Sequence, residues 1–138
     1  MASKKNNARK LSPTQRRDLD IEIGFLEGLV RRDGRCLEAL QMLGDDYTRR
    51  GRFKDGLGID RQLTSLRPDD PLVHYNLACS FSLTRQFAEA ADALRRAIAC
   101  GYRDFKWLRR DPDLASLRKH SLFQNLREEI PGLDSEPR

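Results

Sequence analysis

Residues 40–47, Leu-Gln-Met-Leu-Gly-Asp-Asp-Tyr, return in altered form 34 residues later as His-Tyr-Asn-Leu-Ala-Cys-Ser-Phe at 74–81. Both copies have a large residue first, leucine fourth, a small residue fifth and an aromatic residue eighth. Positions spaced in this way share one face of a helix, and the small residue lets a neighbouring helix approach closely. A period of this length predicts a stack of helix pairs, in which each pair buries its apolar face against the next.

Capping and turn residues set the expected boundaries of these helices. Gly51 suits the left-handed conformation that ends a helix, and the Arg67-Pro68 step ends the next one. Upstream, Ser12-Pro13-Thr14-Gln15 has the form of a capping box and predicts a helix that ends at a Gly34 cap. The predicted antiparallel pairs are 37–49 with 53–66 and 71–83 with 87–100.

This pattern resembles the tetratricopeptide repeat family over roughly residues 18–130. The resemblance implies an all-α superhelix of two full repeats, preceded by a half-repeat helix and followed by capping helices. The segment after Gly101, with Asp111-Pro112 and the Ser121–Gln124 box, is similar to the end of the array in many bacterial members. We expect one domain over 12–130, divided into 12–34, 37–70, 71–104 and 105–130, between a disordered tail (1–11) and a flexible end (131–138).

The positive charge of the chain is concentrated in its first residues. The whole sequence carries a formal charge of +5, but residues 1–17 hold six basic residues and no acid. The remainder is therefore close to neutral, which argues against a basic nucleic-acid-binding face on the folded body. The tail residues Lys4, Lys5, Arg9 and Lys10 either keep the chain soluble or anchor it to an anionic surface such as RNA or a membrane.

The sequence offers no pattern typical of an enzyme or a cofactor site. It contains no glycine-rich phosphate loop, GxSxG or HExxH motif, and its three cysteines lack CxxC spacing. His74 and Cys79 are five residues apart, so they would not face one metal ion from a single helix. We therefore expect a non-enzymatic cytoplasmic protein with reduced thiols, without metal or cofactor.

The family resemblance implies a concave groove lined by the first helix of each repeat. The implied groove residues are Glu38, Gln41, Asp45, Thr48, Arg49, Leu72, Tyr75, Asn76, Cys79 and Ser82. The alternative is that they are ordinary solvated helix positions. Acidic residues in the first half favour a neutral or basic peptide as partner. Tyr75 and Asn76 are expected to dominate binding, because an aromatic ring supplies contact area and a carboxamide can donate to and accept from a peptide backbone. Both lie outside the predicted packing set, so the fold should tolerate their replacement.

Two functions remain open at the level of sequence. The first is an adaptor or scaffold that binds a peptide segment or helix of another protein in the groove. The second is an accessory subunit of a nucleic-acid or membrane assembly, tethered by the basic tail. Strong salt dependence of binding would indicate the second.

Overall fold

The computed structural model describes residues 10–134, and within this range every regular element is helical. The longer helices in this range are α1 (Pro13–Arg32), α2 (Leu37–Arg50), α3 (Phe53–Leu66), α4 (Pro71–Leu83) and α5 (Phe87–Ala99). Short elements follow: α6 (Phe105–Leu108), the 3-10 turn η1 (Pro112–Leu114), α7 (Ala115–Arg118) and α8 (Ser121–Glu129). The predicted all-α solenoid is confirmed.

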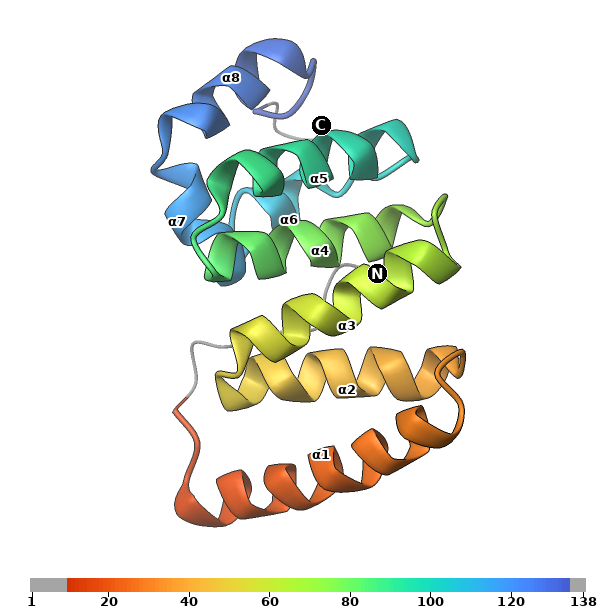
Figure 1. Cartoon of the computed structure of the whole chain (residues 1–138). Coiled ribbons are helices and arrows are strands. Elements are labelled where there is room, and N and C mark those ends of the chain that lie inside the picture. Colours follow the sequence, from red (N-terminus) through yellow and green to blue (C-terminus); the bar gives the residue numbers. More distant parts are fainter. Residues whose placement is uncertain (1–9, 135–138) are drawn as a thin grey trace.

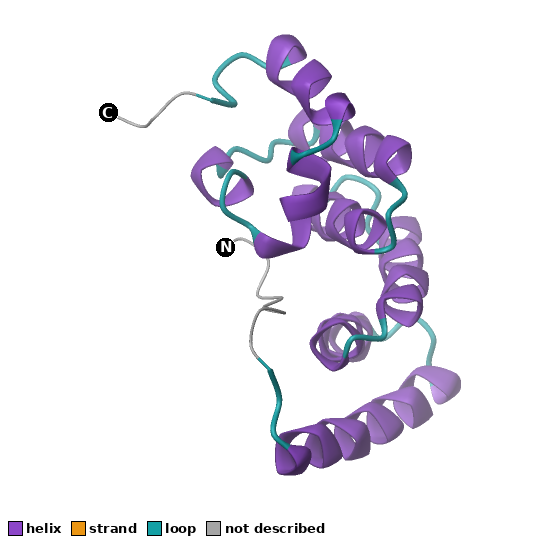
Figure 2. Ribbon diagram, turned by 90° about the vertical axis from the view of Figure 1, so that its left-hand side faces the viewer, coloured by secondary structure: helices purple, strands orange, loops and turns teal. Residues whose placement is uncertain are grey.

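Helices α1 to α5 stack in the order of the sequence, each against the next, and the later elements fold back onto α4 and α5 (Figure 1). Viewed from the side, the stack is curved, with α1 at its lower end (Figure 2). The buried core falls into two clusters of side chains. One joins α1, α2 and α3, and the other joins α4 and α5 to the segment after Gly101. Among the described residues, no helix is both long and apolar enough to cross a membrane.

Local capping explains where most helices begin and end. The Ser12 side chain accepts a hydrogen bond from the Gln15 amide, and the Gln15 side chain accepts one from the Ser12 amide. Gly51 ends α2 with a φ of +85°, as predicted. The Gly34 cap is wrong, because α1 ends on an extended Asp33 whose amide donates to Leu29. The Ser121 box is also wrong, since the helix α8 is capped by the ring of His120.

The C-terminal segment covers the inner face of α4 and one side of α5. It packs through η1 and α7 on α4 and through α8 on α5. Six of its apolar side chains are almost completely excluded from solvent; they are Leu108, Leu114, Leu117, Phe123, Leu126 and Leu133. The predicted capping segment therefore forms part of the second core cluster.

Removing this segment should prevent cooperative folding of the second half of the stack. A chain that ends after Gly101 would expose the faces of α4 and α5 that the segment buries, and buried apolar area supplies most of the folding free energy. We expect a molten or aggregating chain without a sharp thermal transition by circular dichroism. A soluble fragment that unfolds cooperatively would contradict this.

Candidate functional site

The first-repeat residues of the predicted groove lie together on one face of α2. Glu38, Gln41 and Arg49 are at least partly exposed, and Asp45 is half-buried. Thr48 is the exception, because it is buried, donates a hydrogen bond to the Gly44 carbonyl and lies where α2 meets α3. The position assigned to Thr48 in the groove is therefore wrong.

The second-repeat residues are mostly inaccessible to a partner. Tyr75, Cys79 and Ser82 are buried, while Leu72 and Asn76 are half-buried. The physical reason is that the chain after Gly101 packs, through η1 and α7, on the face of α4 that was predicted to line the groove. The expectation that Tyr75 lies outside the packing set is wrong.

Tyr75 is held by hydrogen bonding and by ring stacking. Its hydroxyl donates to the Asp111 carboxylate at 2.7 Å, and its ring stacks on that of Tyr102 with centroids 4.3 Å apart. Burial raises the pKa of Tyr75 far above its usual value, so the hydroxyl stays protonated and can donate. This side chain stabilises the fold and is not available for a partner.

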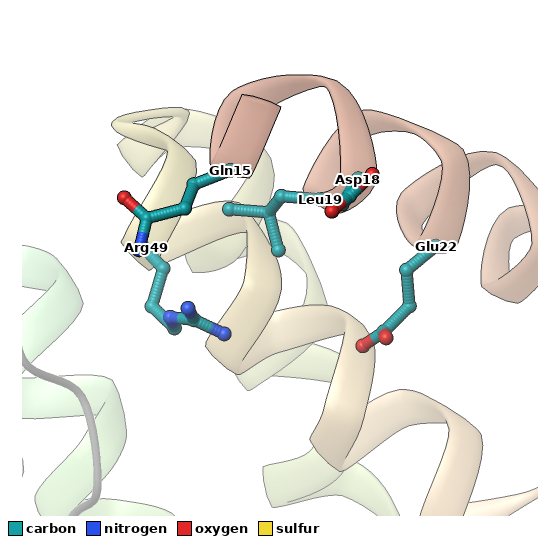
Figure 3. Close-up of a pocket in the computed structure, with 5 residues that line it drawn as sticks. All are labelled: Gln15, Asp18, Leu19, Glu22 and Arg49. Atoms are coloured by element: carbon teal, nitrogen blue, oxygen red, sulfur yellow. The ribbon is translucent and has the colours of Figure 1, made fainter. Parts of the chain in front are cut away.

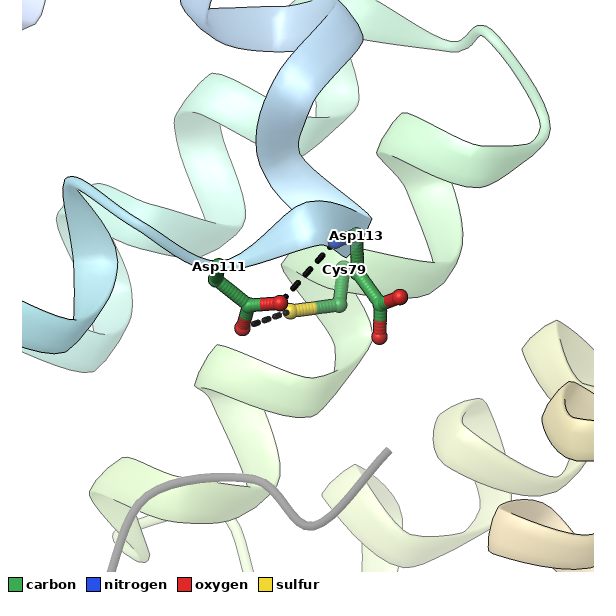
Figure 4. A group of neighbouring side chains, drawn as sticks. All are labelled: Cys79, Asp111 and Asp113. Atoms are coloured by element: carbon green, nitrogen blue, oxygen red, sulfur yellow. Dashed lines mark hydrogen bonds between the residues drawn. The ribbon is translucent and has the colours of Figure 1, made fainter. Parts of the chain in front are cut away.

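Cys79, Asp111 and Asp113 form a buried cluster whose potential ligand atoms lie within 4.8 Å of one another (Figure 4). A thiolate and two carboxylates can bind a divalent cation. However, both Asp111 oxygens already accept hydrogen bonds, one from Tyr75 and Cys79 and the other from the Asp113 amide. These bonds explain the cluster as the attachment of η1 to α4.

Two hollows lie along the seam between the antiparallel helices α1 and α2, and Glu22 lines both of them. The first hollow is lined by Gln15, Asp18, Leu19, Glu22 and Arg49 (Figure 3). The second is lined by Glu22, Phe25, Leu26, Leu29, Cys36, Glu38, Ala39 and Met42. We call the two together the α1–α2 groove.

The second hollow exposes apolar side chains that have no covering element in the described chain. Phe25 is 64% exposed and Met42 is 50% exposed, and Ile21, one turn before Phe25, is 66% exposed. Met42, which lies between the groove positions Gln41 and Asp45, was not among the groove residues predicted from the sequence.

A carboxyl pair lies beneath the groove where the two hollows meet. Asp46 is only 5% exposed, and its Oδ2 atom has no hydrogen-bond partner. Burial, reinforced by a hydrogen bond with the Glu22 carboxyl, raises the pKa of Asp46 to about 7. The Asp46 carboxyl therefore keeps its proton up to about neutral pH. Asp46, unlike the half-buried Asp45 beside it, is thus part of the helix interface and not of an exposed acidic face.

Comparison with known proteins shows a partial relative and no family. No family model matches the chain. A stretch of 86 residues is 33% identical to a chloroplastic protein of Arabidopsis thaliana. The match covers 60% of this chain and 26% of the relative, so this chain corresponds to about a quarter of that protein.

The predicted tail anchor falls mainly outside the described residues. Lys4, Lys5 and Arg9 precede them, and Lys10 is exposed just before α1. The groove, in contrast, is built entirely from described residues of α1, α2 and the turn between them.

Replacing Tyr75 by phenylalanine should destabilise the fold by about 1–3 kcal/mol, because a buried carboxylate loses a donor. Chemical denaturation followed by circular dichroism measures the change. Tyr102→Phe is the matched control, since its hydroxyl donates to a backbone carbonyl at 3.2 Å and its loss should cost less. Equal losses in the two variants would contradict the role given to Asp111.

Replacing Asp46 by asparagine should stabilise the fold in a pH-dependent way. Because its pKa is raised from 3.8 to about 7 on folding, the unfolded chain loses this proton first, and stability falls as the pH rises from 3.8 to about 7. We expect little change below about pH 4 and a gain that grows to about 1–3 kcal/mol by about pH 7 and then stays constant. The control is Asp92→Asn on α5, where the carboxylate is exposed and paired with Arg95. A gain in stability that does not depend on pH would contradict the raised pKa of Asp46.

Proposed function

We propose that this chain is a non-enzymatic interaction module of the tetratricopeptide repeat type, which binds a segment of another protein in the α1–α2 groove. The observation that carries the proposal is the pair of exposed apolar side chains, Phe25 and Met42, beside the acidic residues of the same groove. The partner would be an amphipathic segment with basic residues, because its apolar side chains would cover Phe25 and Met42 while its cations face the acids.

The repeat architecture supports the family assignment. Both sequence copies begin helix pairs, α2 with α3 and α4 with α5, which pack against one another at α3 and α4. Gly44 lies against Ile59 of α3, where an added Cβ would come within 3.3 Å of that side chain. The small residue at this position therefore serves the close approach that the repeat pattern implies.

The length of the groove supports a helical or extended peptide as ligand. Its lining on α1 runs from Gln15 to Leu29. At about 1.5 Å per residue this is roughly 20 Å, or about four helical turns. Short amphipathic helices bind in hydrophobic grooves of this kind through apolar residues spaced by three or four positions.

The charges along the groove support a basic ligand. Asp18, Glu22 and Glu38 line it, and Arg49 stands at the end of the first hollow. A contact of the basic tail with nucleic acid or an anionic membrane remains the alternative, supported by the charge of residues 1–17.

The cysteines support a reducing compartment, and we propose the cytoplasm. No disulfide joins Cys36, Cys79 and Cys100 within the described part of the chain. Reduced thiols are the normal state of cysteine in that compartment.

Peptides selected on the full chain from a phage-displayed library test this function. Phe25→Glu with Met42→Glu should weaken their binding by about 30-fold or more, as expected when a central contact worth about 2 kcal/mol is lost. Both side chains are largely exposed, so the fold should be retained. Fluorescence anisotropy measures the affinity and circular dichroism the fold.

The matched control is Ala88→Glu with Ala99→Glu, which adds the same charges at positions of α5 that are not buried. Binding that survives in the groove variant and is lost in the control would place the partner on the other side of the stack. Binding that disappears on deletion of residues 1–11 and falls steeply with salt would favour the tethered accessory subunit.

A further inference from the structure

We infer that two copies of this chain associate in an antiparallel pair through the solvent-facing side of α1. The contact is a row of five residues, which we call the outer stripe: Asp18, Ile21, Phe25, Gly28 and Arg32. The inference goes beyond the proposed function and does not depend on it, because Ile21 and Arg32 line neither hollow of the α1–α2 groove.

The spacing of the outer stripe is the first support. Its members follow one another at intervals of three, four, three and four residues, so they lie in one row along the helix. This is the spacing of the contact positions in a two-stranded coiled coil. The buried residues Leu19, Ile23 and Leu26 form a separate row, which packs on α2. Helix α1 therefore has two rows suited to helix contact, and α2 covers one of them.

The exposure of the large apolar residues is the second support. Ile21 and Phe25 are the most exposed large apolar side chains of the described chain. Helix α1 packs on α2, and no element of residues 10–134 lies on its far side (Figure 1). Adjacent exposed apolar side chains of this size commonly mark an interaction surface. The outer stripe is thus accessible to a second molecule.

Gly28 leaves room for a large side chain of the other copy. Of the described atoms, only Arg31 Nη2 would come within 4 Å of a Cβ added at Gly28, at 3.8 Å. Packing within the chain therefore does not require glycine, which weakens a helix relative to alanine. In an antiparallel pair centred between Phe25 and Gly28, Phe25 of each copy lies over Gly28 of the other. A large side chain then fills the space beside a small one, as in knobs-into-holes packing.

The charges at the ends of the stripe favour a second copy as the partner and give its direction. Asp18 lies seven residues before Phe25, and Arg32 lies seven residues after it. Neither charged side chain forms an ion pair within the described chain. An antiparallel copy brings Arg32 within about one turn of Asp18 at both ends, whereas a parallel copy sets like charges opposite each other. Arg17 and Arg31 lie about 100° around the helix from the ends of the stripe and point away from it.

The interface should be small and the association weak. Helix α1 has 20 residues and is therefore about 30 Å long. Contact along one face of a single helix lies at or below the lower end of the area buried in stable complexes, about 1,200 Å². We therefore expect a dissociation constant between about 1 and 100 μM. Because Phe25 also lines the second hollow, a segment bound there would compete with the second copy.

Sedimentation equilibrium of the full chain between about 1 and 300 μM tests the inference. The average mass should rise from 15.9 kDa toward twice that value as the concentration increases. Ile21→Glu should raise the dissociation constant at least about 30-fold, because both copies in the pair carry the change. The fold should be retained, since Ile21 is largely exposed, and circular dichroism checks this. Ala88→Glu, at an exposed position of α5, is the matched control and should leave the association unchanged.

Charge exchange at the two ends of the stripe tests the direction of pairing. Asp18→Arg alone or Arg32→Asp alone should weaken the association about tenfold, because each sets like charges opposite each other at both ends. Mixing the two single variants, or combining both changes in one chain, should restore the affinity, because opposite charges meet again. In a parallel pair neither single variant would weaken the association.

The outcomes are distinct from one another. A chain that stays monomeric up to about 300 μM, or a dimer that keeps its affinity in Ile21→Glu, would overturn the inference. So would a dimer that Met42→Glu abolishes and Ile21→Glu does not, since its contact would lie in the groove. Single charge variants that associate as tightly as the wild type would rule out the antiparallel pairing. The proposed function is tested separately, because Ile21→Glu alters the lining of neither hollow and should still bind the selected peptides.

Discussion

The buried carboxylate of Asp111 links α4 to the C-terminal segment that packs on it. It accepts hydrogen bonds from Tyr75 and Cys79 on α4 and from the Asp113 amide on η1. A carboxylate without solvent is tolerated only when such donors surround it. With this contact in place, the C-terminal segment lies against the inner face of α4, and the apolar residues that follow complete the second core cluster.

Closure at this end determines which helix faces stay accessible to solvent. The inner face of α4 is covered, whereas the exposed face of α2 and the adjoining side of α1 are not. The two ends of the stack also differ. The last helix, α8, turns Phe123 and Leu126 inward and exposes Gln124, Asn125 and Glu128, whereas α1 exposes Ile21 and Phe25. The outer side of α8 is therefore more polar than the side of α1 that carries Ile21 and Phe25.

The sequence predicted the regular part of this structure and missed the contacts between distant segments. The 34-residue period and the turn residues at Gly51 and Pro68 predicted the four helices of the two pairs to within about one residue, because each depends on neighbours in the chain. Tyr75 was placed in a groove because its helical position is equivalent to Gln41. What differs is the segment 36 residues away that carries Asp111, and no local pattern encodes that docking. Asp46 was missed for the same reason, since its burial depends on α1.

Asp111 and Asp46 show how two buried carboxyl groups in one chain differ in what they require. Asp111 has donors on both oxygens, so the fold itself accounts for its burial. Asp46 faces a second acid and keeps one oxygen without a hydrogen bond. Its raised pKa lowers the stability of the fold as the pH rises toward about 7. Asparagine at this position would fit the same space and donate to Glu22, so packing does not account for an acid there. Residues that oppose stability in this way concentrate at functional sites.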